Sequence, residues 1–138
     1  MILDGTQQEP ELIANNRVKF RKNSTWPSSL SWLRKQIEEI VNEHGPTLAC
    51  IKCIEPVARK KSSERLNIEG VITEVLSSSF SIECNTRIKS QLKRDIRDFT
   101  EPARYLGHVL EDCDELPALT SPNFQDAALA AISELEPE

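Results

Sequence analysis

The sequence predicts a small α+β domain: a small antiparallel sheet or partial barrel packed against one helix, with further helices at the C-terminal end. Three observations lead to this class. Residues 70–85 alternate between two faces with a period of two, which is typical of a half-buried hairpin. Residues 28–44 carry one apolar stripe at spacings of three and four, and residues 86–99 repeat that helical spacing.

The chain has 138 residues, a length that favours one domain. Residues 1–16 are polar and we expect them to form a flexible lead-in. Residues 17–120 are expected to form the α+β domain with a basic face, and residues 121–138 an acidic C-terminal helix.

The first expected elements are a strand and a helix. Residues 17–22, RVKFRK, alternate apolar and basic side chains, as a short edge strand does. The helix is expected to begin at Pro27 or Ser28, with Thr25 or Ser28 as N-cap, and to end at His44 before the Gly45-Pro46 pair. The stripe that we expect it to pack against the sheet comprises Leu30, Leu33, Ile37, Ile40 and Val41.

The next expected elements are strands. Residues 47–58 are predicted as one strand, which Pro56 breaks or marks as an edge. Residues 66–76 and 79–85 are predicted as a hairpin with a tight serine turn. Its first strand would place Ile72, Glu74 and Leu76 on one face, and its second would place Phe80, Ile82 and Cys84 on one face.

Helices are expected to complete the chain. After residues 86–99, Thr100 can cap a second helix, in which Gly107 is unfavourable. Ser121-Pro122 is expected to open the last helix. The apolar stripe of that helix comprises Phe124, Ala128, Ala131, Ile132 and Leu135.

The cysteines do not indicate a metal site. Cys50 and Cys53 have C-x-x-C spacing, but in a strand they point to opposite faces, and no second such pair exists. Small buried side chains are therefore the favoured interpretation, and we expect no metal and no cofactor. A signal peptide and a run of about 18 apolar residues are both missing from the sequence, so we expect a cytoplasmic protein with reduced thiols.

The sequence shows no motif for catalysis. It lacks G-x-S-x-G and a glycine-rich phosphate loop, and neither His44 nor His108 has a recognisable nucleophile or carboxylate partner. We therefore expect no enzyme and no catalytic residues. A site assembled from residues distant in sequence is the remaining alternative.

Charge is distributed unevenly along the chain. Residues 17–66 carry eleven bases against five acids, and residues 101–138 carry nine acids against one base. A basic half is typical of a protein that binds phosphates, although two opposite halves can also neutralise each other. The two basic clusters that bracket the expected hairpin form the predicted nucleic-acid-binding site: Arg59, Lys60, Lys61, Arg65, Arg87, Lys89, Lys93 and Arg94.

The resulting functional prediction is a non-catalytic nucleic-acid-binding domain, a subunit of a larger assembly. Its partner would be RNA or DNA, and no membrane is involved. The alternative is a protein-interaction adaptor or chaperone-like dimer whose helices carry the interface. An exposed apolar stripe would favour that alternative, and one positive groove would favour nucleic acid.

The hairpin also carries a resemblance. Residues 68–76, IEGVITEVL, and 80–83, FSIE, resemble the opening hairpin of the bacterial translation initiation factor 1 family. Residues 93–97, KRDIR, resemble the basic stretch that follows it there. The resemblance implies an OB-type barrel that binds nucleic acid, and it covers about a fifth of the chain.

Overall fold

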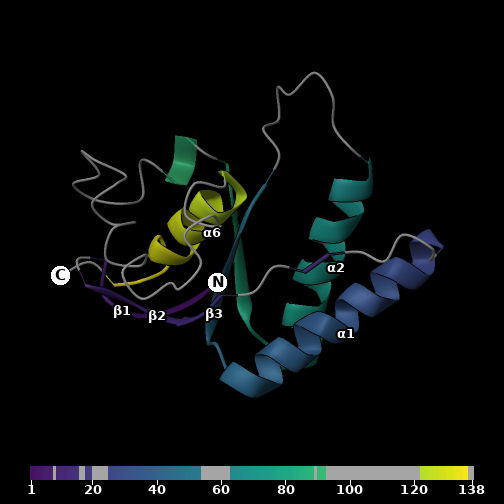
Figure 1. The fold of residues 1–138 in the computed structure, drawn as a ribbon, viewed down its shortest axis with the longest axis horizontal. Helices are drawn as coiled ribbons and strands as arrows, with labels where there is room; N and C mark the ends of the chain where they lie inside the picture. The colour runs from purple at the N-terminus through teal and green to yellow at the C-terminus, as the bar shows by residue number, and fades with distance from the viewer. Residues whose placement is uncertain are drawn as a thin grey trace. The chain divides into compact units, whose positions relative to one another are not determined.

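The computed structural model describes residues 1–7, 9–15, 18–19, 25–53, 63–88, 90–92 and 122–136 (Figure 1). Helices and short strands alternate along these residues, which confirms the predicted α+β class. The chain divides into two compact units. Unit 1 comprises residues 1–15, 50–55 and 85–138, and unit 2 comprises residues 16–49 and 56–84.

Unit 1 begins with a hairpin of β1, Ile2–Gly5, and β2, Pro10–Ala14. The strands are antiparallel, with an irregularity in register between Ile2 and Leu3. Gly5 closes the first strand at φ 91°, a conformation that glycine adopts without strain. These residues form a hairpin where we expected a flexible lead-in. The sequence did not predict it because the period-two alternation is short and carries few β-branched side chains.

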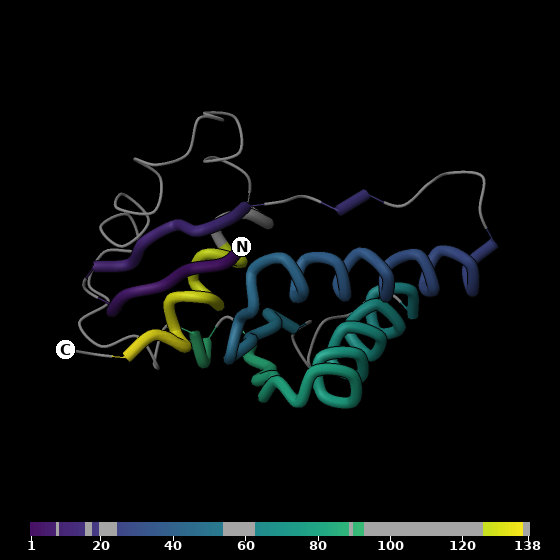
Figure 2. The backbone as a smooth tube through the Cα atoms, turned by 90° about the horizontal axis from the view of Figure 1, so that it is seen from below, coloured from purple at the N-terminus to yellow at the C-terminus, as the bar shows by residue number. Residues whose placement is uncertain are grey.

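The hairpin packs against α6, Pro122–Ile132, as two views of the backbone show (Figures 1 and 2). The helix was expected at this position, but its buried side is wider than the expected stripe and includes Leu129 and Ala130. After α6, a bridge between Thr6 and Glu136 continues the contact with β1. The core of unit 1 comprises Leu92, Leu129, Ala130 and Ile132, with Met1, Leu3, Leu12 and Cys50 packed against it.

Unit 2 is built on α1, Trp26–His44, close to its predicted bounds. The hydroxyl of Thr25 caps the first turn by accepting from the backbone N–H of Ser28 at 3.4 Å. Gly45 ends the helix at φ 59° and donates its N–H to the carbonyl of Val41 at 2.8 Å. The C-terminal cap was predicted from the sequence, and Thr25 was one of the two predicted N-cap candidates.

The predicted hairpin at residues 70–85 is wrong, because its first strand is helical and the strand that follows, Glu83–Arg87, pairs with Leu48–Lys52 instead. Residues Ser63–Phe80 form α2, which lies beside α1 in both backbone views (Figures 1 and 2). The main partner of α1 is thus a helix, not the sheet. The apolar residues of this segment fit both the two-residue period of a strand and the 3.6-residue period of a helix. The helix forms, and it buries one side of the segment. The core of unit 2 comprises Val41, Val75, Leu76 and Ile82, with Ile37, Ala49, Ile72, Phe80 and Cys84 packed against it.

Hydroxyl groups within α2 find partners inside the helix. Thr73 donates to the carbonyls of Glu69 and Gly70 at 2.9 and 3.0 Å, and Ser78 donates to the carbonyl of Glu74 at 2.8 Å. These bonds satisfy the hydroxyl groups within the helix itself, without a neighbouring strand. A residue with high strand propensity such as Thr73 is therefore tolerated in the helix. Ser81 then takes φ 53°, and its N–H bonds to the carbonyl of Ser77 as the chain leaves the helix.

The remaining strands are β3, Leu48–Lys52, and β4, Glu83–Arg87, which pair with each other in a two-stranded sheet. In both strands the chain passes from unit 2 to unit 1. A helical turn follows at residues 90–92, where the side-chain oxygen of Gln91 accepts from the N–H of Ile88 at 2.9 Å.

Among the helices that the structure describes, none combines the length and the apolar composition needed to cross a bilayer.

Candidate active site

The predicted nucleic-acid-binding residues fall into two groups. Two of them lie in described parts of the chain. Arg65 is exposed on α2, with its Nε 3.4 Å from Oε1 of Glu69 one turn later. Arg87 lies on β4, and its side chain is 19% exposed. The other six lie outside the described residues, so their convergence on one face stays a prediction: Arg59, Lys60, Lys61, Lys89, Lys93 and Arg94.

Arg87 is engaged within unit 1. Its guanidinium forms an ion pair with Glu134, whose side chain is 12% exposed. The same Nη1 lies 3.3 Å from Oγ of Ser133 and 3.3 Å from Sγ of Cys50. Glu134 also accepts from the amide of Asn85 at 2.9 Å. These bonds fix the segment after α6 to β3 and β4, which is a structural role.

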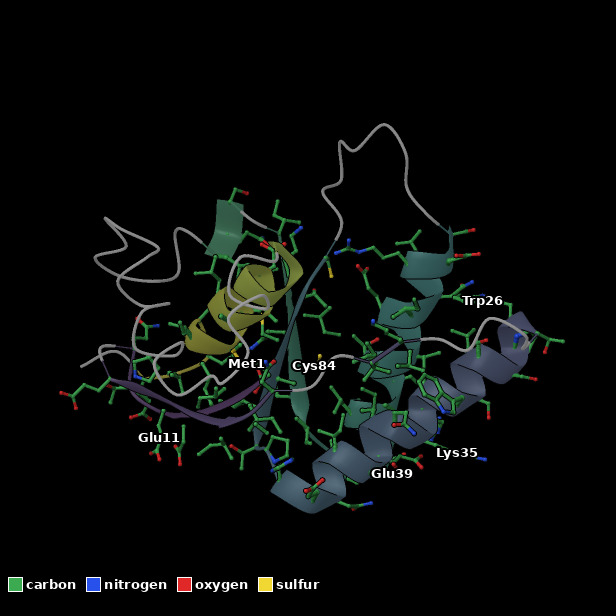
Figure 3. The ribbon with its side chains drawn as sticks, viewed as in Figure 1. Met1, Glu11, Trp26, Lys35, Glu39 and Cys84 are labelled. Carbon is green, nitrogen blue, oxygen red and sulfur yellow. The ribbon has the colours of Figure 1, made fainter. Side chains whose placement is uncertain are left out.

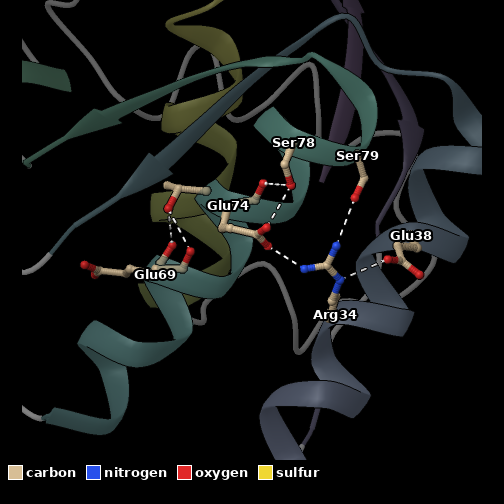
Figure 4. Close-up of polar contacts among 8 residues, drawn as sticks. Arg34, Glu38, Glu69, Glu74, Ser78 and Ser79 are labelled. Atoms are coloured by element: carbon tan, nitrogen blue, oxygen red, sulfur yellow. Dashed lines mark hydrogen bonds and ion pairs between the residues drawn. The ribbon is translucent and has the colours of Figure 1, made fainter.

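Unit 2 has an arginine network that is more exposed. Arg34 on α1 donates to Glu74 on α2 at 2.5 Å, to Ser79 at 3.0 Å and to Glu38 at 3.2 Å (Figure 4). The side chains of Arg34 and Glu74 are 40% and 54% exposed. This network joins the two helices at the surface.

A shallow groove of about 360 Å³ also lies on unit 2. It is formed by residues 18–19 and one side of α1, and its lining mixes Trp32 with the acids Glu39 and Glu43. The mixed lining has no cluster of convergent catalytic groups, so we do not assign it a reaction.

Two carboxylates face each other across the hairpin of unit 1. Asp4 on β1 is directly opposite Glu11 on β2, and both are exposed (Figure 3 labels Glu11). The neighbouring pair, Leu3 and Leu12, packs on the core, so the acid pair faces the other side of the hairpin. Like charges directly opposite each other destabilise a hairpin, and a bound cation would relieve that repulsion.

A third carboxylate is held by a lysine. Asp126 on α6 and Lys52 at the end of β3 are joined by a contact of 3.4 Å between Oδ2 and Nζ. The two side chains are 26% and 20% exposed, so solvent screens this pair less than a surface pair. Asp126 is the one acid within a helix that is otherwise apolar and amide-bearing, PNFQDAALAAI.

These acids have the chemistry of a divalent-cation site. Mg²⁺ binds through one or two carboxylates and completes its shell with water and substrate phosphate oxygens. Asp4 and Glu11 supply two carboxylates on the face of the hairpin opposite the core, and Asp126 is a separate carboxylate that is paired with Lys52. Within the described ranges, no three potential ligands gather into one group.

Solved structures resemble more than nine-tenths of the chain. RuvC from Thermus thermophilus in complex with Holliday junction substrate matches with a TM-score of 0.71 at 13% identity, over 91% of this chain and 78% of that chain. A second structure of Thermus thermophilus RuvC matches with a TM-score of 0.71 at 12% identity, over 95% of this chain and 81% of that chain. The fold is that of RuvC. No family model and no curated protein sequence matches.

This match corrects three predictions. The resemblance to translation initiation factor 1 and the OB-type barrel are wrong, because the α+β fold of the chain is similar to that of RuvC. The predictions of a non-catalytic binding domain and of no enzyme are overturned as well, since the matching protein is solved with a substrate. The adaptor alternative receives no support from the match.

Sequence reasoning missed the acids because it searched for known motifs. Asp4 lay in the presumed lead-in, and Asp126 was counted among the charges of an acidic end. One signal was present in each case: Asp4 ends an apolar run, MIL, and Asp126 interrupts an apolar helix.

Proposed function

We propose that this chain is a nuclease that hydrolyses phosphodiester bonds in branched DNA. The observation that carries the proposal is the match to RuvC over more than nine-tenths of the chain, together with the carboxylates that the same fold presents in unit 1. Branched DNA is the proposed substrate because one matching structure holds RuvC with a Holliday junction.

The proposed catalytic residues are two separate sets, the carboxylate pair of Asp4 and Glu11 and the single carboxylate of Asp126. They would hold divalent cations, which supply a Lewis acid for the phosphate and lower the pKa of a bound water. The chain's own part is to position the carboxylates: the hairpin register sets Asp4 against Glu11, and packing of α6 on the core of unit 1 sets Asp126. Lys52 provides a positive charge beside Asp126.

The basic residues predicted from the sequence then contact the DNA backbone. Arg59, Lys60 and Lys61 follow β3, and Lys93 and Arg94 follow the turn at 90–92. Each phosphate contact that such a residue makes adds about 0.9 to the log–log slope of affinity against salt. Arg87 is excluded from this set because it is engaged with Glu134. A homodimer or complex subunit remains part of the prediction.

Cleavage of a four-way junction by the intact chain tests the proposal. Purified protein with Mg²⁺ should cut the junction faster than a linear duplex of the same sequence, and chelation should stop the reaction. Asp4→Asn and Asp126→Asn should each lower the cleavage rate about 100-fold or more, the loss typical of removing one electrostatic group from an active site.

Glu9→Gln is the matched control. Glu9 is an exposed acid in the turn of the same hairpin, so its loss should leave the cleavage rate unchanged. Folding of every variant is checked by circular dichroism. Wild-type protein that binds junctions but never cuts them, or Asn variants that cut at the wild-type rate, would refute the proposal.

A further inference from the structure

The groove on unit 2 lies on a face of α1 that differs from the face used by the core of that unit. The helix residues that line it recur at spacings of three and four and so share one side of α1: Trp32, Gln36, Glu39, Ile40 and Glu43. Ile40 was expected in the stripe that packs the helix, but it is not among the apolar side chains described in the core of unit 2. This face thus combines half-buried apolar side chains with exposed acids.

The charged residues of the groove are mainly acidic. Glu39 and Glu43 are exposed and one helical turn apart, and the lining contains one base, Lys19 (Figure 3 labels Glu39). Within the described residues Glu39 has no ion-pair partner, and Glu43 reaches only His44, with 3.8 Å between Oε2 and Nε2. Charge complementarity therefore favours a basic occupant and disfavours an acidic one.

The non-helical part of the lining shows which kind of chain this face accepts. Residues 18–19 form neither helix nor strand, and they place the half-buried Val18 and the exposed Lys19 in the groove. A non-helical segment with a base is thus already accommodated against α1. The volume of about 360 Å³ is at the low end of the range for ligand sites, about 300–1,000 Å³, so the groove suits a few side chains of a peptide.

We infer that this groove docks an extended basic segment of a partner protein, with lysine or arginine at alternate positions. Such side chains bury their aliphatic stems on apolar surface, here Trp32 and Ile40, and carry their charges to the carboxylates at the edge. A cation over the ring of Trp32 is attracted further by the ring itself. The inference concerns unit 2 and goes beyond the nuclease activity proposed for unit 1.

The spacing of the two acids fits such a segment. Side chains four residues apart on a helix, such as Glu39 and Glu43, have Cβ atoms about 5–6 Å apart. Alternate side chains of an extended chain lie on one face, about 6.6 Å apart. Two bases at alternate positions can therefore reach both carboxylates at once.

Binding of a synthetic peptide to the intact chain tests the inference. The probe is a short acetylated and amidated peptide in which arginine and serine alternate, and the matched peptide has glutamate in place of arginine. The chain has two tryptophans, so its ¹H–¹⁵N spectrum contains two indole resonances, which Trp26→Phe assigns. The arginine peptide should shift the Trp32 resonance to saturation and leave that of Trp26 in place, and the glutamate peptide should shift neither.

Substitution of the two acids locates the peptide. Glu39→Gln with Glu43→Gln should raise the dissociation constant of the arginine peptide about fivefold, because two exposed ion pairs are lost. Glu64→Gln with Glu83→Gln is the matched control, since it removes the same charge from two exposed acids of unit 2 outside the groove and should leave the dissociation constant unchanged. Glu39→Lys with Glu43→Lys should bind the glutamate peptide in place of the arginine peptide.

Three results would overturn the inference. Equal weakening in the two Gln double variants would mean that binding follows total charge, and an unmoved Trp32 resonance would place the peptide elsewhere. Sedimentation equilibrium covers the third: a chain that dimerises, and becomes monomeric with Glu39→Lys and Glu43→Lys, would have a second copy in the groove instead of a basic partner. None of these measurements uses DNA or metal, so their failure is distinct from failure of the proposed nuclease activity.

Discussion

The ion pair between Arg87 and Glu134 gives the sharpest test of the difference between sequence and structure. Sequence reasoning made Arg87 a phosphate contact, whereas the structure places it in unit 1 with its side chain 19% exposed and its partner 12% exposed. Arg87→Met leaves Glu134 without its cation. Breaking a buried pair in this way costs about 3–5 kcal/mol, and residual exposure favours the low end, about 3 kcal/mol.

The matched control is Arg34→Met in unit 2. That arginine also makes an ion pair, but its side chain is 40% exposed and that of Glu74 is 54% exposed. Exposed pairs contribute about 0.2–1 kcal/mol. For a chain of this size about 1 kcal/mol corresponds to roughly 3 °C in the unfolding midpoint, so the expected decreases are roughly 9 °C for Arg87→Met and at most about 3 °C for Arg34→Met.

Thermal unfolding followed by far-UV circular dichroism measures both variants. Tryptophan fluorescence adds a second probe, since Trp26 and Trp32 both lie on α1 and report on unit 2. Replacing both members of the buried pair by apolar residues, as in Arg87→Met with Glu134→Leu, should regain most of the lost stability. If Arg87→Met is no less stable than Arg34→Met but binds DNA more weakly, Arg87 is a phosphate contact and the structural assignment is refuted.

Three further predictions concern the scaffold. Ile132→Ala should destabilise the protein by about 2–5 kcal/mol in urea unfolding, because its side chain is fully buried. In the same assay Ile13→Ala, at a position that is 47% exposed, should change the stability by less than about 0.5 kcal/mol. Gly70→Ala should stabilise α2 by about 0.5–1 kcal/mol, since a new Cβ meets nothing there. Gly45→Ala should destabilise α1, because the φ of Gly45 is 59°. Equal effects of the two substitutions would contradict the role of Gly45 as the C-terminal cap of α1. Glu11→Gln should stabilise the hairpin by about 0.2–1 kcal/mol at low salt, and the gain should shrink in high salt.

The helix α1 could be predicted from the sequence nearly to the residue. Its caps are local: Thr25 binds an N–H three residues away, and Gly45 needs only its own left-handed conformation. Local signals of this kind do not depend on the rest of the fold. Its partner could not be predicted, since the stripe specifies that the helix packs but not against which element.

The helix α2 shows where pattern reasoning fails. Residues 71–76 are rich in β-branched side chains, which favour a strand, and the same segment has the spacing that puts Ile72 and Leu76 on one side of a helix. Tertiary packing on α1 decides the competition, because the helical form buries Val75 and Leu76 against Val41. Losing the hairpin also removed the reason to expect an OB-type barrel.

The candidate carboxylates were also not predicted from the sequence. The prediction relied on clusters of basic residues, whereas a nuclease of the proposed kind uses acids for its chemistry. Asp4 can be recognised as part of an acid pair only from the register of the hairpin, which places it opposite Glu11, seven residues later. Asp126 can be recognised as a paired carboxylate only from the fold, in which α6 places it beside Lys52, a residue distant in the sequence. Under the proposed function, the bases that follow Lys52 in the sequence would attract DNA and the carboxylates of unit 1 would act on it, so the basic and acidic parts of the chain would serve successive steps of one reaction.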